Sequence, residues 1–197
     1  MSLKKTQIIT FYNKLKNNPA VKFTIVFLIL YLLFDYANKF FNNVNTPDAK
    51  YFNAYVSEHF NYIQLLRTSL ILSTVKIMEL MGYFMMYSKT QILALNGIPS
   101  NINYGCLGLG VFSFWAAFVL AFPKSLKEKL KFLIIGLVSI FLLNVFRLVI
   151  LTILTVEIPY EKEYFTYHHD AFNFFVYTVL FIMIYFWVKK SNIVSST

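Results

Sequence analysis

Charged residues are scarce in this sequence, making up 14% of its 197 residues against roughly 25% in an ordinary soluble domain. Apolar residues make up 58%, aromatic residues 19%, and the mean hydropathy is +0.58. This scarcity of charge argues against a soluble globular protein. A disordered or nucleic-acid-binding tail would be polar and poor in aromatic residues, so that class is disfavoured as well. We expect a membrane protein with several spans.

Cysteine is almost absent too. The single residue, Cys106, excludes a disulfide within the chain. One cysteine with the adjacent pair His168 and His169 lacks the ligand spacing of a zinc site, so we expect no metal and no cofactor. The sequence also lacks paired inverted repeats and broken apolar helices, which makes a transporter the weaker interpretation.

Long apolar runs are what the sequence has in place of charge. A helical span takes about 20 residues, so the chain holds about four to six spans and forms one membrane domain, 1–197. Four runs are apolar and long enough to span, and the first has no cleavage site after it, so we expect a retained signal anchor. They are 23–41, 105–122, 132–156 and 171–188.

Lysine clusters beside these runs predict the topology. Lys and Arg flank spans on the cytoplasmic side, so both termini and the loop after the second span are expected inside. The three clusters are Lys4, Lys5, Lys14, Lys16 and Lys22; Lys124, Lys127, Lys129 and Lys131; and Lys189 and Lys190. We therefore expect a multi-pass protein of the cytoplasmic (inner) membrane with a basic cytoplasmic N-terminus (1–22), an extracytoplasmic segment (42–104) and a three-span core (105–188).

Segment 62–87 is apolar but carries Arg67, Lys76 and Glu79. A charge near the bilayer centre costs about 2.5–3.5 kcal/mol, and an extra crossing would break the lysine topology. We expect an amphipathic helix lying in the outer interface. The alternating run 91–98 ends in Asn96-Gly97, which predicts a type I′ hairpin. The fold class is an all-α membrane protein: a small transmembrane bundle of about four spans, with one interfacial helix and a short extracytoplasmic hairpin.

Three unusual residue types meet at the outer face in this topology. Cys106 opens the second span, Arg147 lies roughly 12 Å below the outer end of the third, and His168 and His169 lie at the mouth of the fourth. Each has a plain structural interpretation. The cysteine can be a small buried hydrophobe, the arginine can pair with Glu157 or Asp170, and the histidines can be interfacial anchors. Asp170 suits a helix N-cap better than a catalytic carboxylate.

Together these residues fit nucleophilic catalysis. A thiolate is stabilised at a helix N-terminus and beside a cation, which describes Cys106 with Arg147 nearby. His169 could accept the thiol proton and return it to a leaving amine. Arg147 could stabilise the thiolate or the oxyanion of an acyl intermediate.

At these residues the sequence resembles the exosortase/archaeosortase family, in particular its compact bacterial members. The resemblance covers about 91–188 and rests on YGCLGL at 104–109, FP at 122–123 before a Lys-rich loop, LNVFRL at 143–148 and HDAFN at 169–173. It implies Cys106 as nucleophile, Arg147 as the intramembrane arginine and His169 as the third member. His168, Asn144 and Asp170 are secondary candidates. The family's Cys-Asn-Gly or Cys-Ser-Gly run reads Cys-Leu-Gly here.

The resemblance implies a membrane-embedded cysteine transpeptidase or peptidase that faces the outside of the cell. Its partners would be exported proteins with a C-terminal sorting tail, membrane lipid and an acceptor that the sequence does not identify, with no nucleic acid. The alternative is a non-catalytic scaffold or partner subunit of an export or polysaccharide assembly system.

Overall fold

The protein is mostly helical. The computed structural model describes residues 18–47, 49–157 and 162–194, with the side chains of 162–172 and 190–194 left out. The helices and strands, in chain order, are α2 (Pro19–Asn45), α3 (Ala54–His59), α4 (Tyr62–Leu80), β1 (Met85–Tyr87), β2 (Gln91–Ala94), β3 (Ser100–Asn101), the 3-10 helix η1 (Tyr104–Leu107), α5 (Leu109–Ala121), α6 (Leu126–Glu157) and α7 (Lys162–Val194).

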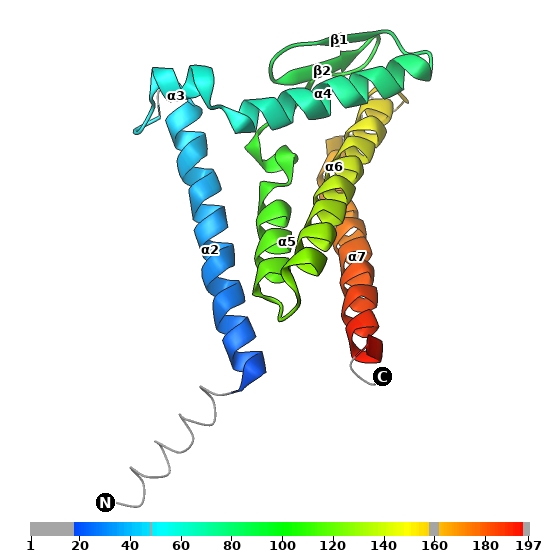
Figure 1. The fold of residues 1–197 in the computed structure, drawn as a ribbon. Coiled ribbons are helices and arrows are strands. Elements are labelled where there is room, and N and C mark those ends of the chain that lie inside the picture. Colours follow the sequence, from blue (N-terminus) through cyan, green and yellow to red (C-terminus); the bar gives the residue numbers. More distant parts are fainter. Residues whose placement is uncertain (1–17, 48, 158–161, 195–197) are drawn as a thin grey trace, which may run out of the picture.

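Helices α2, α5, α6 and α7 run along a common direction, and α4 crosses one end of this bundle with the small sheet beside it (Figure 1). Within the described residues, α2 and α6 are the helices long and apolar enough to cross a membrane. The apolar helix α5 has 13 residues, or about 20 Å, which is shorter than a hydrocarbon core of about 30 Å. The prediction of four spans is therefore not confirmed.

The second apolar run, 105–122, forms a shorter helix than expected because its first residues form a different structure. Gly108 has a left-handed backbone (φ 71°), which separates η1 from α5 and starts α5 at Leu109. Cys106 therefore lies in a 3-10 turn ahead of the helix, and the expectation that it opens the second span is wrong.

Helix α4 is shorter than the interfacial helix expected over 62–87. It ends at Leu80 because Gly82 adopts φ 91° and the Tyr83 N–H bonds back to the Met78 carbonyl, closing the helix as a C-terminal cap. Residues 85–87 then form β1. The helix lies across the bundle, as expected for this segment, and it buries one face at helical spacing: Ile63, Leu70, Ile71, Thr74, Val75 and Met78.

The hairpin region differs from the type I′ prediction. Strands β1, β2 and β3 form an antiparallel sheet in that order, with Ile92 opposite Ser100. Asn96 and Gly97 lie in the five-residue connection between β2 and β3, and of the two only Asn96 has positive φ. A type I′ turn needs positive φ at both residues, so the connection is a longer loop.

Two apolar clusters share α6 and hold it in place. One lies between α4, the sheet, η1 and the C-terminal half of α6. The other surrounds Trp115 of α5, which is fully buried against Phe132 of α6 and packs with Val176 and Leu180 of α7. A side chain at Gly136 would overlap the Trp115 indole, so this glycine lets α5 and α6 approach closely. Because both clusters pack on α6, the polar residues of this helix are held at a fixed position beside η1.

Candidate active site at Cys106

The thiol of Cys106 is held at the turn between the sheet and α5. Its residue is half-buried, and its Sγ lies 3.2 Å from the side-chain oxygen of Asn103, the residue before η1. The Cys106 backbone N–H bonds to the Asn103 carbonyl at 3.0 Å, which closes the turn. Asn103 is thus a polar neighbour that sequence reasoning missed, although an asparagine ahead of a Gly-Cys pair is a recognisable turn signal.

Asn144 anchors the other end of this turn. Its side-chain amide, on α6 and 6% exposed, donates a 3.2 Å hydrogen bond to the carbonyl of Leu107. A Cβ at Gly108 would collide with the same amide, so the close approach of α6 requires glycine there. Asn144, named from the sequence as a secondary candidate for the catalytic site, therefore contacts the segment that positions the thiol.

Arg147 lies one turn further along α6 and is 6% exposed. Its guanidinium is near enough to Cys106 for an electrostatic interaction. Glu157 lies ten residues further on the same helix, about 15 Å away, and contacts the Tyr83 hydroxyl instead. The structural alternative paired Arg147 with Glu157 or Asp170. The structure does not form the Glu157 pair, and the Asp170 side chain lies outside the described residues, so the Asp170 pair stays open.

A second arginine, Arg67 of α4, also lies near the thiol. Burial lowers the pKa of Arg67 and the nearby Cys106 raises it, and the group stays cationic at neutral pH. Its Nη1 donates to the Gln64 side-chain oxygen at 2.5 Å, and its buried Nε has no hydrogen-bond partner. Sequence reasoning treated Arg67 only as a barrier to crossing. Nothing in the sequence separates Arg67 from Lys76 on the same helix, and only the fold places Arg67 near the thiol.

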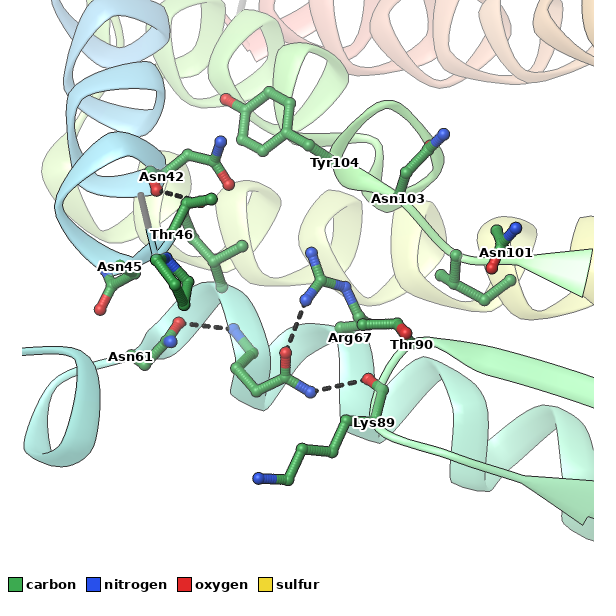
Figure 2. Close-up of a pocket in the computed structure, with 14 residues that line it drawn as sticks. Asn42, Asn45, Thr46, Asn61, Arg67, Lys89, Thr90, Asn101, Asn103 and Tyr104 are labelled. Atoms are coloured by element: carbon green, nitrogen blue, oxygen red, sulfur yellow. Dashed lines mark hydrogen bonds between the residues drawn. The ribbon is translucent and has the colours of Figure 1, made fainter. Parts of the chain in front are cut away.

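A cavity of about 750 Å³ lies beside these residues, within the usual range for a ligand site. The cavity is lined by the end of α2, the start of α4, the β1–β2 turn and the segment from β3 to η1. Figure 2 shows the Arg67 guanidinium pointing from α4 toward Asn103 and Tyr104. Burial raises the pKa of Tyr104, helped by Asp35, so its phenol stays protonated at neutral pH. The lining residues are Asn42, Asn45, Thr46, Pro47, Asn61, Ile63, Gln64, Arg67, Lys89, Thr90, Asn101, Ile102, Asn103 and Tyr104.

The histidine pair falls in α7, which begins at Lys162. Helix α7 therefore begins nine residues before the fourth span expected at 171–188, and Asp170 lies inside the helix, so it is not the N-cap. The side chains of His168, His169 and Asp170 lie outside the described residues. Helix α7 packs against α6, which carries Arg147.

The described part of the chain contains no group of three or more His, Cys, Asp or Glu side chains that could hold a metal ion. The chemistry that the geometry offers is that of a single thiol with an amide acceptor and two nearby guanidinium groups.

Comparison with protein families finds one described as transmembrane exosortase, matched over residues 19–186. Comparison with curated proteins and with solved structures finds no match. The family match and the apolar helices together show a membrane protein. Because the matched segment runs from α2 through most of α7 and includes Cys106, Asn144 and Arg147, the chain belongs to the transmembrane exosortase family.

Proposed function

We propose that this protein is a membrane-embedded cysteine transpeptidase or peptidase that cleaves the C-terminal sorting tails of exported proteins at the outer face of the cytoplasmic membrane. The observation that carries the proposal is the half-buried thiol of Cys106, held on a turn at one end of the bundle, in contact with Asn103 and near the buried Arg147. A thiol held in this way is suited to attack a peptide carbonyl.

In the proposed reaction the Cys106 sulfur attacks the carbonyl carbon of the scissile peptide bond. The C–N bond then breaks, leaving an acyl thioester on Cys106, and the leaving amine takes up a proton. Attack by an acceptor amine gives a transferred product, and attack by water gives a released carboxylate. Arg147 stabilises the oxyanion that forms before each bond breaks, since a preorganised cation in a dry site interacts strongly with developing negative charge.

We assign the proton transfers to His169. It lies in the first turns of α7, a helix that packs against α6, and it would accept the thiol proton and donate it to the leaving amine. His168 is the alternative for this role. The partners in this scheme are exported proteins whose tails combine a short motif, one apolar span and a basic end.

The test is to trap the thioester. The full-length protein and a tailed exported protein are co-expressed, and membranes are treated with hydroxylamine, which converts an acyl thioester to a hydroxamate. Mass spectrometry should find a hydroxamate at the new C-terminus of the substrate with wild-type protein and none with Cys106→Ala. An uncleaved substrate in both samples would favour the scaffold alternative.

A further inference from the structure

The end of the bundle opposite α4 is rich in lysine. It is formed by the α5–α6 connection, the start of α2 and the last turns of α7 (Figure 1). Aromatic side chains join these segments: the Phe122 ring lies 5.7 Å from that of Phe23 on α2 and 5.1 Å from that of Trp187 on α7, between centroids. Within the described residues, Glu128 is the acid in these segments, and the lysines are Lys22, Lys124, Lys127, Lys129, Lys131 and Lys189.

Two of these lysines hold helix ends together. Lys124 and Lys129 are half-buried, and their ammonium groups donate to the backbone carbonyls of Trp187 and Leu120 at 2.6 and 2.7 Å. The Lys124 ammonium also lies 4.1 Å from the centre of the Trp187 ring. These contacts give Lys124 and Lys129 a structural role in joining α5 and α6 to their neighbours.

Lys127 and Lys131 are placed differently. Both are exposed, and they are four residues apart on α6, so they lie on the same side of that helix. The ion pairs that the described residues form lie on α2 and α4. The nearby Glu128 side chain accepts from the Ser125 hydroxyl at 3.2 Å. Lys127 and Lys131 therefore present positive charge that the described part of the chain does not neutralise.

A stripe of exposed apolar side chains, the α6 stripe, starts at the same place. Its members recur every four residues, which puts them in one row on the helix surface, and each is 46–67% exposed. The stretch from Leu126 to Val138 is about 18 Å long, close to one leaflet of a hydrocarbon core of about 30 Å. The α6 stripe consists of Leu126, Leu130, Ile134, Val138, Leu142 and Phe146.

We propose that this surface binds one phospholipid with a net negative headgroup. Its phosphate lies against Lys127 and Lys131, and an acyl chain lies along the first half of the α6 stripe. The charge selects the lipid, because a neutral headgroup leaves the two lysines uncompensated, whereas an anionic one is attracted to lysines at a membrane surface. The apolar row beside the lysine pair selects a lipid over a free anion. The predicted topology puts this lipid in the inner leaflet.

The test compares two lipids that differ only in the headgroup. Full-length protein in detergent is titrated with phosphatidylglycerol or with phosphatidylcholine of the same acyl chains, and native mass spectrometry gives the dissociation constant of each complex. Phosphatidylglycerol should bind more tightly. Lys127→Gln/Lys131→Gln should weaken its binding about five-fold per lysine, or about 25-fold for the pair, and should leave phosphatidylcholine binding nearly unchanged.

Two further variants make this result specific. Lys127→Arg/Lys131→Arg keeps both charges and should keep the preference for phosphatidylglycerol. The matched control is Lys50→Gln/Lys76→Gln, which removes two exposed lysines away from the α5–α6 end. An unchanged preference in Lys127→Gln/Lys131→Gln, or an equal loss in the control, overturns the proposal.

The acyl-chain half of the site is tested separately. Leu130→Ser should weaken both lipids by a similar factor and leave their ratio unchanged, because it removes apolar contact and no charge. Leu95→Ser is the control, since Leu95 is exposed in the β2–β3 connection, away from the α6 stripe. If Leu130→Ser binds both lipids as tightly as wild type does, the acyl chain does not lie on the α6 stripe and the proposed site is wrong.

Two other occupants give distinct results. If glycerol phosphate displaces phosphatidylglycerol at an equal concentration, the lysines hold a free anion and the lipid assignment is wrong. If the protein stays dimeric at every lipid concentration and binds neither lipid, the α6 stripe is an interface between two copies, which also overturns the proposal. None of these measurements requires turnover, so their outcome is independent of the hydroxylamine test.

Discussion

The side-chain oxygen of Asn103 lies 3.2 Å from the sulfur of Cys106, across a single turn of 3-10 helix. Asn103 occupies the N-cap position of that turn, yet its side chain makes no capping bond to the backbone. Its amide oxygen is therefore available to accept the thiol hydrogen, and it fixes the direction of the sulfur. This contact supplies the polar neighbour that the Cys-Leu-Gly run lacks.

Replacing Asn103 by alanine should slow substrate processing by about two- to ten-fold, because one neutral hydrogen bond contributes about 0.5–1.5 kcal/mol. Asn103→Asp should be more damaging, since a carboxylate beside the sulfur opposes the thiolate. The measurement is the cleavage rate of a tailed substrate in membranes with equal enzyme. Asn43→Ala is the control, because that exposed asparagine bonds only to its own helix. Equal rates for Asn103→Ala and wild type would remove Asn103 from the site.

Cys106→Ala should abolish processing and leave the protein folded and inserted, because the half-buried side chain it removes is small. Cys106→Ser should fail almost as completely, since a hydroxyl lacks thiolate character. Immunoblots of substrate and enzyme in the same membranes measure cleavage and insertion together. Processing by the alanine variant would end the enzyme hypothesis.

Arg147→Lys separates charge from geometry. A lysine keeps the positive charge, but it loses the paired planar donors and moves the remaining charge. We expect Arg147→Lys to be nearly as damaging as Arg147→Ala, with a loss of about 10²–10³ in rate, the usual effect of removing an oxyanion donor. Cleavage rates at equal protein amounts provide the comparison. A lysine variant within a few-fold of wild type would reduce Arg147 to a generic cation.

Gly108→Ala should destabilise the turn that carries the nucleophile. A side chain there is strained at φ 71° and collides with the Asn144 amide. The left-handed backbone alone costs roughly 1–2 kcal/mol for a residue with a Cβ. Gly110→Ala is the matched control, because a Cβ at that position meets nothing within 4 Å. Thermal unfolding in detergent should show a lower midpoint for Gly108→Ala alone, and equal midpoints would contradict the close packing of α6 on the turn.

The predicted orientation is testable by labelling single cysteines in the Cys106→Ala background. Lys89→Cys and Ser100→Cys should react with a membrane-impermeant maleimide from outside, and Lys127→Cys should react only after the membrane is permeabilised. This expectation rests on the lysine clusters and on the position of α4 across the bundle. Protection at 89 and 100 with free labelling at 127 would reverse the topology.

The sequence alone predicted the membrane class, the helix that lies across the bundle, and the pairing of Cys106 with Arg147 as candidates. These features are read from composition, hydropathy and charge, which are local properties of the chain. The same local signals misplaced several boundaries. The run 105–122 is uniformly apolar, and nothing in its hydropathy shows that Gly108 adopts a left-handed backbone and divides a turn from a helix.

Tertiary structure decided which side chains surround the thiol. Arg67 and Arg147 each lie about 40 positions from Cys106 in the sequence, and they meet it because α4 crosses the end of α6 and both pack on the turn between the sheet and α5. In the sequence Arg67 was only a charge too costly to place in the bilayer. Its unpartnered Nε and its place in a cavity with Lys89 depend on three separate segments coming together, and that packing is not encoded in the periodicity of any one of them.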